Sequence, residues 1–217
     1  MSKRNNGARL LTTSVPADPS SVILVLHGGA SDSTMRVAPT SLAALRLIPV
    51  ARAVAARVSD AVVYRLRFAV RGWNGDGADV LADAAWAIEQ LAARHPGLPV
   101  VVVGHSLGGR VAMHVVQTSP FVVGAVGLAP WVERTDPVEG LAGIPLAVIQ
   151  GTKDRIVPEQ STRAWLARAE QAGAHIQSFL IDGGGHAMLR FIWRWHRLAA
   201  DGVVSVLAAA AQPATRL

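Results

Sequence analysis

The chain has 217 residues, of which 51% are hydrophobic and 17% are charged. This composition excludes an intrinsically disordered protein, and the length suits one sizeable hydrophobic core, so we predict a single domain over residues 1–217. No apolar stretch reaches the roughly 18 residues that a membrane-spanning helix needs, and no apolar signal segment follows the basic N-terminus. We therefore expect a cytoplasmic protein with no membrane span.

The net charge of +6 comes from 21 basic and 15 acidic residues. The arginines are scattered over helix-like segments and form no run with interleaved aromatic residues, so nucleic acid is not an expected partner. Cysteine is absent, which excludes disulfides, thiolate metal sites and cysteine nucleophiles. No histidine pair has metal-ligand spacing, and we expect neither a metal nor a cofactor.

Apolar runs of strand length alternate with helix-length segments along the chain. The predicted strands cover residues 21–29, 61–68, 99–106, 121–129, 145–151 and 174–182, and residues 8–15 are predicted to add an antiparallel edge strand. The predicted helices cover residues 40–57, 78–95, 107–118, 160–172 and 187–210. This alternation predicts an α/β fold with a doubly wound, mostly parallel sheet. Open parallel sheets bind ligands at the carboxyl ends of their strands, so the loops there should carry the function.

The loop Gly104-His-Ser-Leu-Gly-Gly109 lies between a predicted strand and a predicted helix. A turn this tight strains the backbone of Ser106, and side chains two positions to either side would collide, which glycine avoids. The pattern G-x-S-x-G is the nucleophile elbow of serine hydrolases. At the start of a helix, the Ser106 hydroxyl also lies where free N–H groups favour a developing anion.

With this elbow the chain resembles the α/β-hydrolase family over most of its length. The segment from Thr152 to Pro158 resembles the acid loop of that family, and the segment from Gly183 to His186 resembles its histidine loop. The resemblance implies that Ser106 is the nucleophile, that His186 is the base and that Asp154 orients the base. Asp182, nearer to His186 in sequence, is the alternative acid.

The segment His27-Gly28-Gly29-Ala30 resembles the family's oxyanion loop. It implies that the Gly29 N–H joins the Leu107 N–H in binding the oxyanion, with the Ala30 N–H as the alternative donor. For His27 and His105, structural hydrogen bonds are expected rather than base chemistry.

Many family members carry a cap domain after the strand that ends near residue 129. Here thirteen residues lie between Trp131 and Pro145, too few for a helical cap, so we expect an open site. Trp73 and Trp131 are the candidate walls of the substrate site, unless they only cover the edge of the sheet. Arg67 and Arg71 could bind an anionic substrate, although salt bridges to Asp76 or Asp79 are the alternative.

The predicted function is the hydrolysis of a small-molecule carboxylic ester or thioester through a seryl acyl-enzyme. The lidless outline is similar to that of dienelactone-hydrolase-like and acyl-thioesterase-like proteins, although Ser106 stands where dienelactone hydrolases have cysteine. The alternatives are acyl transfer, cofactor-free perhydrolysis, or ligand binding without catalysis. A monomer or a homodimer is expected. Trp193 and Trp195 could contribute to a dimer surface or pack against the sheet.

Overall fold

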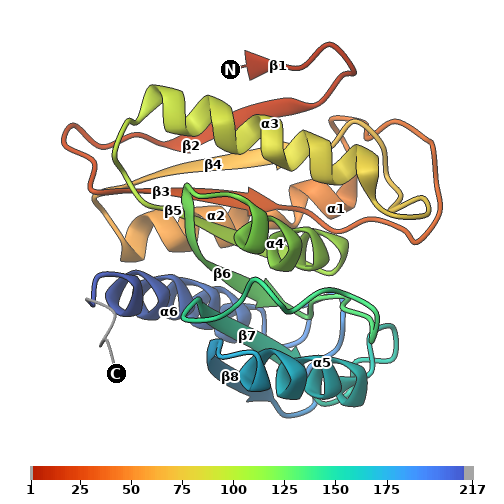
Figure 1. Cartoon of the computed structure of the whole chain (residues 1–217). Coiled ribbons are helices and arrows are strands. Elements are labelled where there is room, and N and C mark those ends of the chain that lie inside the picture. Colours follow the sequence, from red (N-terminus) through yellow and green to blue (C-terminus); the bar gives the residue numbers. More distant parts are fainter. Residues whose placement is uncertain (1, 213–217) are drawn as a thin grey trace.

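The computed structural model describes residues 2–212, which form an eight-stranded sheet flanked by helices (Figure 1). The strand order is β1-β2-β4-β3-β5-β6-β7-β8. The strands β3 to β8 are parallel, whereas β2 pairs antiparallel with β4 and β1 pairs antiparallel with β2. The strands are β1 (Ser2–Lys3), β2 (Arg9–Ser14), β3 (Ser21–Leu26), β4 (Ala61–Arg67), β5 (Val100–His105), β6 (Val122–Leu128), β7 (Pro145–Gly151) and β8 (His175–Ile181).

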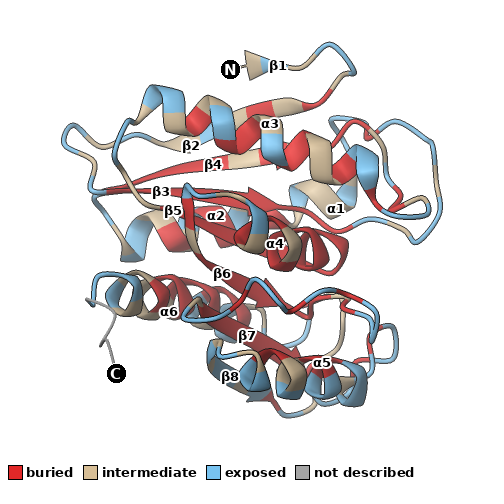
Figure 2. Cartoon of the chain, in the orientation of Figure 1, coloured by how far each residue is buried: buried red, intermediate tan, exposed pale blue. Residues whose placement is uncertain are grey.

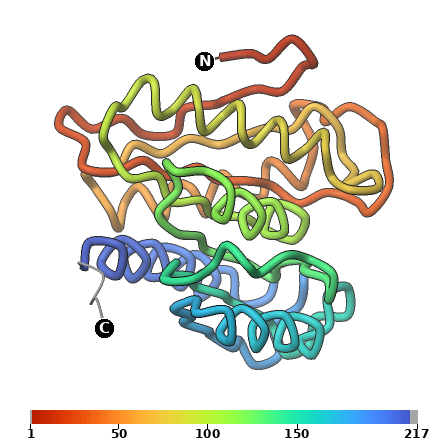
Figure 3. The backbone as a smooth tube through the Cα atoms, viewed as in Figure 1, coloured from red at the N-terminus to blue at the C-terminus, as the bar shows by residue number. Residues whose placement is uncertain are grey.

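Helices cover both faces of this sheet. They are α1 (Leu42–Leu45), α2 (Leu47–Arg57), α3 (Ala78–Arg94), α4 (Leu107–Thr118), α5 (Glu159–Gln171) and α6 (Ile192–Ala210). The helices α3, α4 and α5 bury apolar side chains in one core cluster, while α2 and α6 bury theirs in a second cluster on the other face. The path of the chain between the two faces can be followed in Figure 3.

The central strands are continuous apolar runs because both of their faces are covered. In β3, Leu24 belongs to one core cluster while Ile23 and Val25 belong to the other. Figure 2 shows the same contrast, with the central strands buried and the connecting loops largely exposed. Exposed side chains in β8 mark it as an edge strand.

The predicted α/β fold with a doubly wound, mostly parallel sheet is confirmed. The structure differs from the prediction in three places. The antiparallel strand predicted at residues 8–15 is present as β2 (Arg9–Ser14), but β1 pairs with its outer side and forms the edge of the sheet. The helix predicted at 40–57 is broken at Arg46, because Pro49 has no N–H to donate to the carbonyl of Leu45. The last helix begins at Ile192 rather than at residue 187, because Met188 and Phe191 have positive φ angles.

The carboxyl ends of the parallel strands lie at one edge of the sheet, called here the carboxyl edge. His105 at the end of β5 is in register with Leu128 of β6, and Leu128 with Ile149 of β7. Within residues 2–212 no helix lies between β6 and β7, so nothing like a cap domain is inserted there. None of the helices in the described part of the chain is both long and apolar enough to cross a membrane. The single domain over residues 1–217 stays a prediction, since residue 1 and residues 213–217 lie outside the described residues.

Candidate active site

Ser106 lies in a strained turn between β5 and α4. Its φ and ψ angles are 54° and −118°, a region that non-glycine residues rarely adopt. A Cβ on Gly104 would lie 2.0 Å from the carbonyl oxygen of Gly108. A Cβ on Gly108 would lie 2.5 Å and 2.6 Å from the carbonyl oxygens of Leu26 and His27. Glycine at both positions therefore permits the turn, as the spacing predicts.

The neighbouring strand β6 also holds this turn. The N–H of Ser106 donates to the carbonyl of Leu128 (3.0 Å), and the carbonyl of Ser106 accepts from the N–H of Trp131 (3.0 Å). These two hydrogen bonds fix the serine from both sides of its Cα atom. The side chain of Ser106 consequently projects from the carboxyl edge with little backbone freedom.

Ser106, His186 and Asp154 form one hydrogen-bonded chain. Nδ1 of His186 lies 2.8 Å from Oδ2 of Asp154, and Nε2 of His186 lies 2.9 Å from Oγ of Ser106. A carboxylate can only accept, so Nδ1 carries the proton and Nε2 is free to accept from the serine hydroxyl. The loops of the acid and the histidine are joined as well, because the Lys153 N–H donates to the carbonyl of Gly184 (2.9 Å).

The Asp154 carboxylate is held by several donors. Its Oδ1 accepts from the N–H groups of Ile156 and Val157, both at 2.9 Å, and its Oδ2 accepts from Nε2 of Gln150 at 3.1 Å. Burial by itself would raise the pKa of Asp154, but the hydrogen bonds from His186, Val157 and Ile156 hold that pKa below its ordinary value. The carboxylate is therefore ionised at neutral pH and fixed in orientation.

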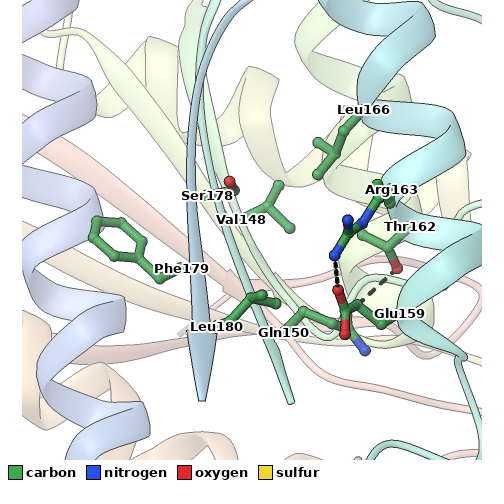
Figure 4. Close-up of a pocket in the computed structure, with 9 residues that line it drawn as sticks. All are labelled: Val148, Gln150, Glu159, Thr162, Arg163, Leu166, Ser178, Phe179 and Leu180. Carbon is green, nitrogen blue, oxygen red and sulfur yellow. Dashed lines mark hydrogen bonds and ion pairs between the residues drawn. The ribbon is translucent and has the colours of Figure 1, made fainter. Parts of the chain in front are cut away.

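Gln150 is a residue of this site that the sequence motifs did not identify. Its Nε2 also donates to the carbonyl of Val157 (3.0 Å), and its Oε1 accepts from Oγ1 of Thr162 (3.4 Å). Figure 4 shows Gln150 and Thr162 on the wall of a cavity of about 260 Å³ between β7, β8 and α5. The available signal was a polar residue at the end of an otherwise apolar strand, four positions before the acid.

Asp182 makes a different contact. Its Oδ1 accepts from Oγ1 of Thr152 at 3.0 Å, and Asp182 is exposed. The imidazole of His186 bonds to Asp154 instead. The geometry therefore favours Asp154 over Asp182 as the acid.

His105 and His27 are buried and form hydrogen bonds to the backbone. Nε2 of His105 donates to the carbonyl of His186 (2.9 Å), while Nδ1 of His27 donates to the carbonyl of Gly28 (2.7 Å). Burial, together with the electrostatic effect of the neighbouring His186 ring, lowers the pKa of His105 to about 3. Burial lowers the pKa of His27 to about 4. Both rings are neutral at pH 7, so they can position backbone without exchanging protons there.

The two residues predicted to supply the oxyanion donors, Gly29 and Leu107, are in close contact. A Cβ built on Gly29 would lie 3.1 Å from Cδ1 of Leu107, and one on Gly28 would lie 3.2 Å from Cβ of Ser106. Among residues 2–212 the Gly29 N–H donates to no backbone carbonyl, and the Leu107 N–H, as the first of α4, has no acceptor within its helix. The Ala30 N–H donates to the carbonyl of Arg71 (2.8 Å), which leaves Gly29 as the available donor of the two.

The two predicted substrate-binding tryptophans differ in exposure. Trp73 is buried and Trp131 is half-buried, and their rings meet edge to face at 6.4 Å. Between them lies the guanidinium of Arg110, 4.1 Å from the Trp73 ring and 4.7 Å from the Trp131 ring. Trp73 thus packs on a cation, and Trp131 offers the more accessible surface.

A groove opens beside Trp131. It has a volume of about 400 Å³ and lies between the loop after β6 and the start of α5. Its apolar lining includes Trp131, Val132, Ile156, Val157, Pro158 and Ala164. Since Ile156 and Val157 also hold Asp154, this groove adjoins the hydrogen-bonded chain.

The expected salt bridges of Arg67 and Arg71 are not found. Neither arginine forms an ion pair with Asp76 or Asp79 in the described part of the chain. Asp76 instead accepts from the N–H of Ala78 at the start of α3 (3.1 Å), a local bond that satisfies a free helical donor. No group of three or more His, Asp or Glu residues that could hold a metal ion occurs among residues 2–212.

Comparisons with known proteins place this arrangement in context. A family model described as serine aminopeptidase, S33, matches residues 69–142, which include the turn at Ser106. No curated protein has a sequence that matches the chain.

Solved structures match over nearly the whole chain. An α/β serine hydrolase homologue from Coxiella burnetii has 14% identity and a TM-score of 0.71, covering 94% of this chain and 95% of that chain. Est1E from Butyrivibrio proteoclasticus with bound ferulic acid has 12% identity and a TM-score of 0.68, covering 93% and 95%. XC6422 from Xanthomonas campestris, an α/β serine hydrolase without a lid, has 18% identity and a TM-score of 0.65, covering 92% and 88%. The chain therefore has the α/β-hydrolase fold, without a cap.

Proposed function

We propose that the chain is a serine hydrolase that cleaves a small-molecule carboxylic ester or thioester through a seryl acyl-enzyme. The observation that carries this proposal is the hydrogen-bonded chain from Ser106 through His186 to Asp154, with distances of 2.9 Å and 2.8 Å. Both lie within the range that proton transfer requires. The same three residue types, hydrogen-bonded from serine through histidine to the acid, perform acyl transfer on several unrelated folds.

In the first half of the reaction, Oγ of Ser106 attacks the carbonyl carbon while its proton moves to Nε2 of His186. The carbonyl π electrons move to oxygen, and the N–H groups of Gly29 and Leu107 stabilise that oxyanion. The intermediate then collapses, the bond to the leaving oxygen or sulfur breaks, and His186 returns the proton to that atom. Asp154 stabilises the imidazolium during the exchange.

In the second half, water replaces the leaving group. His186 removes a proton from the water as its oxygen attacks the acyl carbon, and the proton then passes to Oγ of Ser106. The acid product leaves and the serine hydroxyl is restored, so atoms and charge balance over the cycle. The groove beside Trp131 offers a place for one apolar arm of the substrate. The bound ferulic acid of Est1E suggests aryl acids as one class for an initial screen.

A set of four variants tests the roles of these residues. Ser106→Ala and His186→Ala should each lower kcat for a short p-nitrophenyl ester by roughly a thousandfold or more, with an unchanged circular dichroism spectrum. Asp154→Asn should also lower kcat strongly, because it removes the charge that stabilises the imidazolium. Asp182→Asn is the matched control and should keep nearly full activity. Retained activity in Ser106→Ala would refute the assignment.

The remaining alternatives use the same geometry. Acyl transfer and perhydrolysis would reveal themselves when added alcohol, thiol or hydrogen peroxide competes with water for the acyl group. A protein that only binds ligands would fail to react with a fluorophosphonate probe. Labelling of wild type at Ser106, lost in Ser106→Ala, would exclude that alternative.

A further inference from the structure

Large hydrophobic side chains are unevenly distributed over the surface of the described chain. Ten of them are exposed among residues 2–212, and seven of these lie in the segments that follow β3, β7 and β8 at the carboxyl edge. The seven are Met35, Leu42, Leu45, Ile156, Leu189, Phe191 and Trp193. Single exposed hydrophobic residues are common, but their concentration at one edge indicates an interaction surface.

Five of these residues lie just before, or in the first turn of, two neighbouring helices, α2 and α6. The helices α2 and α6 pack against each other, and Nε of Arg57 donates to Oδ1 of Asp201 (3.1 Å). Ten residues before Arg57 lies Leu47, the start of α2, and ten residues before Asp201 lies Phe191, directly before α6. Because both helices rise about 1.5 Å per residue and lead away from the carboxyl edge, they begin at the same level.

The exposed apolar side chains that precede or open these helices lie at this level and are called here the apolar rim: Leu42, Leu45, Leu189, Phe191 and Trp193. Trp193 is 81% exposed, Leu42 is 75% exposed and Leu189 is 69% exposed. The rim lies close to the candidate active site, since Leu189 follows His186 by three residues. The charge of Arg46, directly after α1, also helps to lower the pKa of buried His105, next to Ser106.

Basic residues are frequent in the segments that carry the seven exposed hydrophobic side chains. Residues 27–46, 152–158 and 182–197 contain seven basic residues, Arg36, Arg46, Lys153, Arg155, Arg190, Arg194 and Arg197, and three acidic residues, Asp32, Asp154 and Asp182. None of the seven basic side chains forms an ion pair with another of residues 2–212. The loops at the opposite edge, residues 15–20, 58–60, 95–99, 119–121 and 172–174, carry Asp18 and Asp60 and no lysine or arginine. Positive charge and exposed apolar side chains thus coincide in the segments that follow β3, β7 and β8, whereas the loops after β4 and β6 carry Asp76, Glu133, Asp136 and Glu139 against Arg71 and Arg134.

We propose that the apolar rim docks on an anionic lipid surface. Tryptophan, phenylalanine and leucine side chains insert at the boundary between headgroups and acyl chains, while arginines attract the negatively charged headgroups. A second copy of the chain fits this edge less well, because seven basic residues would meet their own copies there. Docking would turn the opening beside Ser106 toward the lipid, so the esters taken would be lipid-embedded ones; this part rests on the proposed function.

Co-sedimentation with vesicles tests the proposal. The wild-type protein should sediment with phosphatidylglycerol vesicles at low salt, more weakly with phosphatidylcholine vesicles, and more weakly as salt is added. The double variant Leu42→Gln/Trp193→Gln should lose affinity for phosphatidylglycerol vesicles by at least about tenfold, since each side chain would otherwise be buried in the interface. Phe121→Gln, an exposed aromatic at the opposite edge, is the matched control and should bind like wild type.

Hydrolysis of a short soluble ester separates this proposal from the proposed function. Both rim substitutions lie outside the hydrogen-bonded chain, so all three proteins should turn over that ester equally. Wild-type protein that stays in the supernatant when phosphatidylglycerol vesicles are pelleted would overturn the docking proposal. A control variant that binds as weakly as the double variant would overturn it as well. The proposal would also be overturned if the wild-type protein is a dimer in lipid-free solution and the double variant is a monomer, because the apolar rim would then be an interface between copies. Vesicle binding without ester turnover would leave docking intact and overturn only the hydrolase assignment.

Discussion

Breaking the buried ion pair between Arg110 and Asp136 should be strongly destabilising, because it leaves one buried charge without its partner. Nε and Nη2 of Arg110 both donate to Oδ1 of Asp136, at 3.0 Å and 2.8 Å, and the two side chains are almost completely buried. The other carboxylate oxygen accepts from the N–H of Glu133 (2.8 Å). Burial alone would raise the pKa of Asp136, but hydrogen bonds from His114 and Arg110 hold that pKa below its ordinary value.

Asp136→Asn keeps the shape of this side chain and removes its charge. The guanidinium of Arg110 then stays buried between two indole rings, with only the partly exposed carboxylate of Glu133 at 3.2 Å as its counter-ion. Removing one partner of a buried pair costs about 3–5 kcal/mol because it leaves a charge without compensation. Since Glu133 and the indole faces compensate part of that charge, we expect about 3 kcal/mol.

Equilibrium unfolding in urea measures this loss. With a slope of about 2–3 kcal/mol per M for a chain of this size, the midpoint should fall by about 1 M or more. Asp201→Asn is the matched control, because it removes the charge from the exposed pair with Arg57, and an exposed pair contributes at most about 1 kcal/mol. Equal midpoint shifts in the two variants would refute the reasoning from burial.

Two further predictions concern the surroundings of the serine. The pKa of His105 is about 3 in the folded chain, against an ordinary value of 6.5. Between these two pH values the unfolded chain therefore binds one proton more than the folded chain. The free energy of unfolding should consequently decrease as the pH falls below 6.5, by up to about 1.4 kcal/mol per pH unit for this group. His27 acts in the same direction. His105→Gln should therefore reduce, but not abolish, the dependence of the urea midpoint on pH between pH 7 and pH 5. An unchanged dependence would count against a neutral, buried His105. Gly108→Ala should cost about 1–3 kcal/mol in unfolding free energy and lower ester turnover at least about tenfold, because the new Cβ meets two backbone carbonyl oxygens that cannot turn away. Gly185→Ala, where the nearest atom to a new Cβ is 3.9 Å away, should be tolerated; equal damage in both variants would mean that crowding at Gly108 is not the cause.

The sheet was predictable because its central strands are buried on both faces and are therefore continuous apolar runs. The helix starts were less predictable, since they depend on single residues. Pro49 interrupts a segment whose apolar pattern continues through it, and the positive φ angles at Met188 and Phe191 leave no signal in the sequence.

The candidate site shows the same division. Ser106, Asp154 and His186 could be named because each follows a recognisable strand, and the sheet brings the ends of β5, β7 and β8 to one edge. Their catalytic roles stay a prediction. The partners of Arg110 could not be named, because Trp73, Trp131 and Asp136 come from two loops whose approach depends on tertiary packing. Trp73 is buried against this cation, and its role at the substrate stays a prediction.

The two backbone hydrogen bonds that join Ser106 to Leu128 and Trp131 also determine where this fold can acquire new segments. An insertion between Leu128 and Trp131 would separate the two bonds and release the serine. An insertion after Asp136 leaves both bonds and the buried ion pair in place, because they all lie before it in the chain. Within this loop, a covering domain would therefore have to enter after Asp136, and away from the buried side chains of Val138 and Leu141, to leave the turn that holds the serine unchanged.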